Sequence, residues 1–313
     1  MGSFYCSRTG TARKHGLMEG WCGVCYSPSE VLLPPDVQGA LSMQRPRRHH
    51  DELLRRANGA LEQQDFGEAE AQARRALMLR PDSHEARGAL SSALIEQARY
   101  DEAAGCLAEM LAEEPEDLAA LADLGLCLFE LCEFSAAEAA LSQALELEPH
   151  DPQASYWMAL CLERRGQFEL SERYFRVAHE IDPDAYPCPV RISREEFATA
   201  VASALEELPD ELRAQMLNIS ILVEDLPRED DLRAYDPPLD PCLYGLFVGV
   251  PLAERGQEDL PEVPATIFIY QRNLERFCGD RETLLQEIRL TLLHEIGHFL
   301  GFDEEELADR GLA

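Results

Sequence analysis

The chain has 313 residues and a formal net charge of −31 at pH 7. This length predicts two domains, or a repeat array followed by one domain. Such an excess of negative charge argues against nucleic acid and against an anionic membrane surface as partners. No apolar run approaches the length of a transmembrane helix.

Residues 1–48 carry the weakest pattern in the chain, and we expect a disordered leader there. Basic residues occur near the N-terminus without the continuous apolar stretch of a secretory signal. Cys22 and Cys25 have a thioredoxin-like spacing, but no β-α-β pattern surrounds them, and a zinc site would need a second Cys/His pair. Met43 is an alternative start of translation, because the repeat pattern begins just after it.

Between residues 49 and 185 the chain repeats itself every 34 residues. An aromatic residue, a small residue three positions later and a proline twelve positions after that recur four times. The aromatic residues are Phe66, Tyr100, Phe134 and Phe168, the small residues are Ala69, Ala103, Ala137 and Ser171, and the prolines are Pro81, Pro115, Pro149 and Pro183. The pattern resembles the tetratricopeptide repeat (TPR), a helical hairpin that buries its apolar face by stacking on its neighbours.

The resemblance implies an α-solenoid of about four helical hairpins with a groove that binds a protein or peptide. The acidic composition hints at a basic partner, and the oligomeric state is left open. An alternative is that the repeats only position the C-terminal domain. Four cysteines lie at apolar helical positions of the array, which is typical of small buried side chains in a reducing, cytoplasmic compartment: Cys106, Cys127, Cys132 and Cys161.

The composition breaks at Pro187 and Pro189, which predicts a linker over 186–192 and a second domain over 193–313. Ser193 and Glu196 fit a capping box at the start of a helix. Alternating apolar residues predict strands over 219–223 and 266–270, and the segment 245–251 indicates a short strand or turn. The 266–270 strand could form the sheet edge that an extended substrate joins, as β-augmentation requires.

A helix with Asp280 as its N-cap is predicted to continue through Phe299. His294 and His298 lie one turn apart and away from the apolar stripe, so both imidazoles can bind one metal ion. Glu295 can reach a metal-bound water without binding the metal. This is the H-E-x-x-H arrangement of zinc peptidases, and Gly301 stands where the helix must stop. The alternative is that ordinary packing or solvent satisfies the two histidines.

The third ligand is expected among four consecutive acidic residues, Asp303 to Glu306. In the extended motif the ligand falls six residues after the second histidine, which is Glu304. Asp303 is the alternative. The remaining acids are typical of the first turn of a helix.

Residues 190–313 resemble a family of small bacterial zincin-like metallopeptidases with a minimal α+β fold. The likeness is carried by the order of a helix, a strand, Gly-Leu-Phe-Val-Gly-Val-Pro-Leu, an Ile-Phe-Ile-Tyr strand and the His-Glu-Ile-Gly-His helix. It implies Zn²⁺ bound by His294, His298 and an acidic residue at 304, with Glu295 as general base. Family members often have Asp where this chain has Glu304.

The sequence therefore predicts a mostly α protein that hydrolyses peptide bonds with zinc and recruits a protein substrate or partner through its repeats. Tyr244 and Tyr270 are candidates for stabilising the oxyanion by residue type alone. One alternative is a protein-binding adaptor with a structural or inactive zinc site. The other is a metal-dependent hydrolase that acts on something other than peptides.

Overall fold

A computed structural model describes residues 35–216, 219–252 and 265–312, with side chains from residue 47 onward. The pair Cys22 and Cys25 lies outside the described residues, as does the leader up to residue 34. Residues 35–48 belong to the first helix, which also contains Met43. None of the helices in the described ranges combines the length and apolar character that a membrane span requires.

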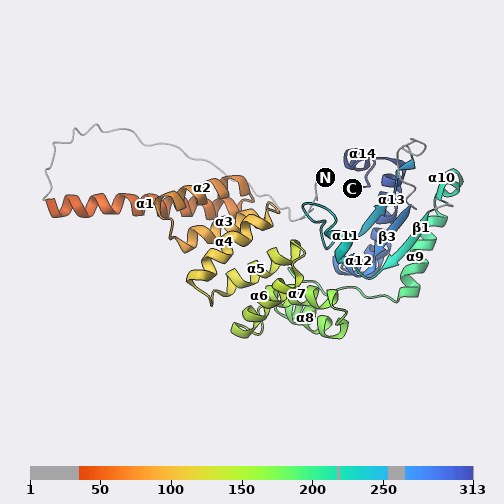
Figure 1. The fold of residues 1–313 in the computed structure, drawn as a ribbon, viewed down its shortest axis with the longest axis horizontal. Coiled ribbons are helices and arrows are strands. Elements are labelled where there is room, and N and C mark those ends of the chain that lie inside the picture. Colours follow the sequence, from red (N-terminus) through yellow and green to blue (C-terminus); the bar gives the residue numbers. More distant parts are fainter. Residues whose placement is uncertain (1–34, 217–218, 253–264, 313) are drawn as a thin grey trace, which may run out of the picture.

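The N-terminal part is an array of helical hairpins that stack in chain order (Figure 1). Its helices are α1 (Pro35–Glu62), α2 (Phe66–Leu79), α3 (His84–Ile95), α4 (Tyr100–Glu113), α5 (Leu118–Glu130), α6 (Phe134–Leu147), α7 (Pro152–Arg164) and α8 (Phe168–Ile181). Each of the four aromatic repeat residues begins the second helix of a hairpin. The four small repeat residues are fully buried there, as close helix packing requires. Four hairpins were predicted, and the array confirms this.

The turns of the array are also periodic. Ser83, Asp117 and Asp151 are the N-caps of α3, α5 and α7, and each side chain accepts a hydrogen bond from the backbone N–H three residues later. Inside the hairpins the chain turns through a residue with positive φ every 34 residues: Gln64, Ala98, Cys132 and Gly166. Cap and turn therefore repeat with the same register as the apolar residues.

The C-terminal part contains a small sheet covered by helices. Its elements are α9 (Arg194–Glu206), α10 (Asp210–Gln215), β1 (Ser220–Glu224), α11 (Glu229–Leu232), β2 (Gly245–Val248), β3 (Thr266–Tyr270), α12 (Gln271–Phe277), α13 (Arg281–Leu300) and α14 (Glu304–Asp309). The strand order is β1-β3-β2, with β1 parallel and β2 antiparallel to β3. The expectation of an edge strand at 266–270 is wrong, because β3 is central and pairs on both sides.

The core of this part lies between the sheet, α9 and α13. Ile267 and Ile269 of β3 are fully buried, and they face a stripe along α13 formed by Ile288, Leu292, Ile296 and Phe299. Phe197 and Val201 of α9 complete the cluster. This packing fixes α13 against the sheet, which determines where its opposite face points.

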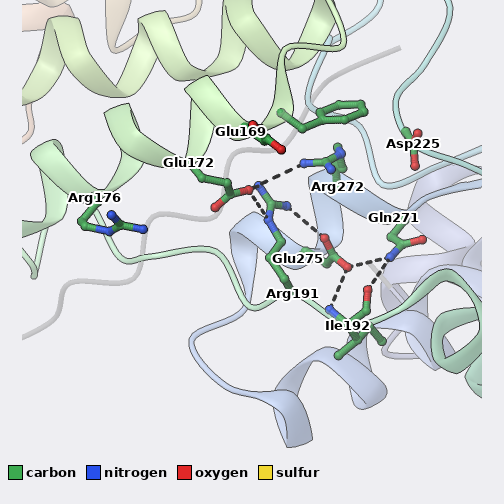
Figure 2. Close-up of a pocket in the computed structure, with 10 residues that line it drawn as sticks. Glu169, Glu172, Arg176, Arg191, Ile192, Asp225, Gln271, Arg272 and Glu275 are labelled. Atoms are coloured by element: carbon green, nitrogen blue, oxygen red, sulfur yellow. Dashed lines mark hydrogen bonds and ion pairs between the residues drawn. The ribbon is translucent and has the colours of Figure 1, made fainter.

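Charged side chains join the C-terminal part to the last hairpin. Glu163, near the end of α7, has no exposed side-chain surface and contacts guanidinium nitrogens of Arg191, Arg272 and Arg276 at 2.6, 2.8 and 2.6 Å. Arg191 also pairs with Glu275 at 2.9 Å (Figure 2). A cavity of about 400 Å³ lies beside this network. Its charged residues largely pair with one another, so we regard it as part of the interface.

Candidate metal centre

Helix α13 begins and ends where the sequence predicted. The side chain of Asp280 caps it by accepting a hydrogen bond from the N–H of Thr283 at 2.9 Å. It ends at Gly301, whose φ of 100° is a left-handed conformation that favours glycine. The chain therefore turns back immediately after the second histidine and runs into α14.

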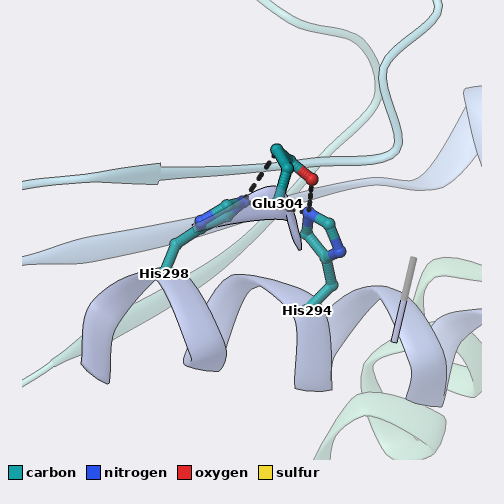
Figure 3. A group of neighbouring side chains, drawn as sticks. All are labelled: His294, His298 and Glu304. Carbon is teal, nitrogen blue, oxygen red and sulfur yellow. Dashed lines mark hydrogen bonds and ion pairs between the residues drawn. The ribbon is translucent and has the colours of Figure 1, made fainter. Parts of the chain in front are cut away.

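His294 and His298 approach each other on one face of α13, with their Nε2 atoms 2.9 Å apart (Figure 3). The Nδ1 of His294 lies 2.7 Å from the carbonyl oxygen of Leu312, and the Nδ1 of His298 lies 3.1 Å from that of Phe302. A carbonyl oxygen only accepts hydrogen bonds, so each Nδ1 carries the hydrogen. When neither Nε2 carries a hydrogen, the two Nε2 lone pairs face a common point.

Glu304, the first residue of α14, closes this arrangement. Its carboxylate oxygens lie 3.3 Å from the Nε2 of His298 and 3.7 Å from that of His294. Two lone pairs at 2.9 Å repel unless a cation lies between them, and the nearby carboxylate also favours a cation. Two imidazoles and one carboxylate form a donor set of catalytic zinc, which leaves a fourth position for water. The residues present therefore fit Zn²⁺.

Asp303, the alternative third ligand, has a different role in the structure. It is the N-cap of α14 and accepts a hydrogen bond from the N–H of Glu306 at 2.9 Å, while the Glu306 side chain accepts one from the N–H of Asp303 at 3.1 Å. This reciprocal capping box occupies the Asp303 carboxylate. Gly297 lets α14 lie close to α13, because a Cβ at this position would overlap Leu307.

Glu295 is almost fully buried, with 6% of its surface exposed, and it lines the same cleft as the histidines. Burial raises the pKa of its carboxyl group to about 8; a hydrogen bond from the N–H of Phe247 opposes this rise, and the charge of Glu304 adds to it. A Cβ on Gly245 would come within 2.8 Å of the Glu295 side chain. Strand β2 therefore holds Glu295, a contact that the spacing of the motif did not predict.

The cleft has a volume of about 450 Å³. It is lined by Leu239, Asp240, Leu243, Gly245, Leu246, Phe247, Gly249, Pro251, His294, Glu295, His298, Gly301, Phe302, Asp303 and Glu304. Tyr244 packs against Phe277, and Tyr270 is buried beside Phe268. Neither tyrosine is among the residues that line the cleft, so the structure does not bring these two candidates for oxyanion stabilisation into it.

A second group that could bind a metal, His84 with Glu114 and Asp117, lies where the second and third hairpins meet. His84 pairs with Asp117 at 2.6 Å, and Asp117 is already the N-cap of α5. These contacts give the group a role in stacking the repeats. Cys127, Cys132 and Cys161 are buried as predicted, whereas Cys106 is half-buried; all four are free thiols.

Comparison with known families agrees with both parts of the chain. Residues 216–312 match the family model of zincin-like metallopeptidases. Residues 129–186, and residues 60–124 and 99–143, match two tetratricopeptide repeat models. The chain thus consists of TPR repeats followed by a zincin-like metallopeptidase domain. This is the class and the order that the sequence predicted.

Among curated proteins no match was found. Among solved structures, a MamA structure from Desulfovibrio magneticus RS-1 is 19% identical, with a TM-score of 0.40 over 47% of this chain and 90% of that chain. A structure described as MamA AMB-1 is 22% identical, with a TM-score of 0.37 over 47% of this chain and 76% of that chain.

Proposed function

We propose that the chain is a zinc-dependent metallopeptidase whose repeats recruit a protein substrate or partner. The observation that carries the proposal is the convergence of the two Nε2 atoms and the Glu304 carboxylate beside Glu295. In this proposal His294, His298 and Glu304 bind the metal. The carbonyl groups of Leu312 and Phe302 keep both rings in the tautomer that binds it.

When bound, zinc supplies Lewis acidity and lowers the pKa of a coordinated water to about 7. The protein's own contribution to the reaction is the proton transfer. The Glu295 carboxylate accepts a proton from the attacking water and then donates it to the amine nitrogen as the peptide C–N bond breaks. Gly245 and the Phe247 N–H hold this carboxylate in place.

The cleft supports an extended peptide as substrate. Among the described residues, strand β2 is an edge of the sheet and lines the cleft, so its outer side can pair with a substrate strand beyond the Phe247 N–H, which already donates to Glu295. Within the described residues, the lining contains four carboxylic acids, Asp240, Glu295, Asp303 and Glu304, and neither Arg nor Lys. We therefore expect neutral and basic side chains to be preferred over acidic ones near the cleaved bond.

The repeats support recruitment of a protein, since TPR arrays present an extended surface for peptides and proteins. We keep three further expectations as part of the proposal. The partner is a protein or peptide rather than a nucleic acid. The free, largely buried cysteines suit a reducing cytoplasm. The domain boundaries lie at residues 49, 185 and 193.

The proposal is tested by cleavage of a proteome-derived peptide library with zinc-loaded protein. Glu295→Gln keeps the size of the side chain but cannot accept the proton, so we expect cleavage to fall by about 10²–10⁴ while the zinc content stays constant. Glu305→Gln, an exposed acid of α14, is the matched control and should behave as wild type. Equal cleavage by wild type and Glu295→Gln would refute the role of Glu295. A zinc-loaded wild type that cleaves no peptide would favour the adaptor.

A further inference from the structure

The segment Pro227–Leu243, which connects β1 to β2, contacts both the repeats and the cleft. Its residues Leu239, Asp240 and Leu243 line the cleft that contains His294 and Glu304. The backbone of the same segment accepts hydrogen bonds from side chains of the third and fourth hairpins. The segment thus forms one wall of the proposed peptidase site, and the repeats contribute to holding it in place.

Arg164, the last residue of α7, holds both ends of this segment. One guanidinium nitrogen donates to the carbonyl oxygen of Pro227, and the other donates to that of Pro241 at 2.6 Å. The guanidinium also lies over the ring of Phe134, 4.8 Å from its centre. A planar group with several fixed donors suits two carbonyl oxygens far apart in sequence better than a single ammonium group does.

The third hairpin holds the middle of the same segment. Arg233 donates to the carbonyl oxygen of Cys132 at 2.6 Å and pairs with Glu133 at 3.3 Å. The sulfur of Cys132 lies 3.8 Å from the carbonyl oxygen of Leu239. The turn between α5 and α6 therefore contacts the segment at Arg233 and at Leu239, which itself lines the cleft.

Within its own domain, the segment is fixed mainly at the end that leads into β2. Asn273 of α12 donates to the carbonyl oxygens of Pro241 and Leu243 at 3.1 and 2.7 Å. Within the described part of this domain, its other backbone hydrogen bonds are local, such as the bond from the Leu239 N–H to the Leu232 carbonyl. Among the described residues, the hydrogen bonds that reach residues 227–240 from other elements therefore involve Arg164 and the Cys132 turn, while packing of the buried Leu232 side chain adds to them.

We propose that Arg164 is a positioning residue of the peptidase site, through which the fourth repeat fixes one wall of the cleft. The repeats then act on the reaction itself, beyond any role in recruitment. The inference rests on the proposed function for its catalytic consequence. Its structural part, the tether between Arg164 and residues 227–241, does not depend on activity.

The test compares full-length Arg164→Ala and Arg164→Lys with Arg165→Ala. Arg165 is the adjacent arginine, and it pairs with Glu138 inside the array, so its loss leaves the segment alone. Hydrogen exchange of the amides of residues 228–243 should become about tenfold faster or more in Arg164→Ala, because two charge-assisted hydrogen bonds are lost. Arg164→Lys should restore part of the protection, and Arg165→Ala should match wild type.

The kinetic readout is the KM of a cleaved library peptide, which should rise in Arg164→Ala while zinc content is unchanged. Arg233→Ala, which removes the second tether at a more exposed side chain, should accelerate exchange in the same segment even if Arg164→Ala folds poorly. Wild-type protection of 228–243 in both variants would overturn the proposal. Faster exchange in a protein whose wild type cleaves nothing would uphold the tether and refute the peptidase function separately.

Discussion

Asp303 and Glu304 are adjacent in sequence, yet their carboxylates have different partners. Asp303 caps α14, whereas Glu304 faces the two histidines. We expect Glu304→Ala to lose zinc on dialysis at nearly unchanged stability. Asp303→Ala should keep zinc but lower the free energy of unfolding by about 1 kcal/mol, because the capped N–H loses its partner. Metal analysis and denaturant unfolding of both variants would show this, and the opposite pattern would make Asp303 the ligand.

At the residue scale, the spacing of the motif predicted that His294 and His298 share one face of a helix, because residues four apart point the same way. The extended motif added Glu304, and the structure places these three side chains together. The motif could not reveal the groups that orient the side chains of the site. Phe247 and Leu312 reach Glu295 and His294 from other elements. Such contacts depend on tertiary packing, and no local pattern encodes them.

At the scale of elements, the hairpin turns offer a matched pair of substitutions. Ala98 and Gly166 occupy equivalent turns, with φ values of 54° and 69°. A side chain is strained in this conformation, so Gly166→Ala should lower the free energy of unfolding by about 1 kcal/mol. Ala98→Gly should raise the free energy of unfolding by at most about 1 kcal/mol. Glycine relieves the strain at positive φ, but its greater freedom in the unfolded chain offsets part of this stabilisation.

Chemical denaturation of the two variants checks this prediction. Helix content by circular dichroism serves as the control for an intact array. A stabilised Gly166→Ala variant would contradict it, because no heavy atom lies within 4 Å of a Cβ at this position to supply a compensating contact.

Periodicity predicted most of the elements because each repeat and strand buries one face. The 34-residue register placed the second helix of every hairpin, and alternation placed β1 and β3 within a residue of their bounds. It could not give the strand order, because pairing depends on contacts between distant segments, and β3 lies in the centre. Helix α12, which follows β3 directly and carries two arginines of the interface, Arg272 and Arg276, was not foreseen.

At the scale of the whole molecule, Glu163 links the repeats to the zincin-like domain. Its buried carboxylate contacts three guanidinium groups, and removing one charge from a buried network leaves the others uncompensated. Glu163→Gln should therefore lower the free energy of unfolding by about 3 kcal/mol at pH 7, measured by denaturant unfolding. Glu138→Gln, which breaks an exposed pair with Arg165, should cost less than about 1 kcal/mol.

The effect of Glu163→Gln on the free energy of unfolding should also depend on pH. Burial alone would raise the pKa of Glu163, but the guanidinium groups, with Arg276 foremost, bring it below its ordinary value of 4.5. A carboxyl group whose pKa is lowered by folding stabilises above its unfolded pKa, and this contribution is lost as the pH falls through the folded pKa. The difference between wild type and Glu163→Gln should thus be largest near neutrality and shrink below about pH 4.5. A constant difference from pH 7 to pH 3 would contradict this.

These contacts bear on the domain boundary at 186–192. A fragment of residues 46–186 keeps the hairpin contacts, so we expect it to be helical. It also leaves Glu163 and Arg164 without their partners from the zincin-like domain. We expect such a fragment to be less stable than the same hairpins in the full chain.

The central claim is that α13 and α14 form one zinc site, and zinc content tests it most directly. Purified full-length protein should contain about one zinc per chain, and the double variant His294→Ala, His298→Ala should contain almost none. His84→Ala, in the other group of metal-capable residues, is the matched control and should retain the wild-type amount. Undiminished zinc in the double variant, or its loss from His84→Ala, would contradict the account.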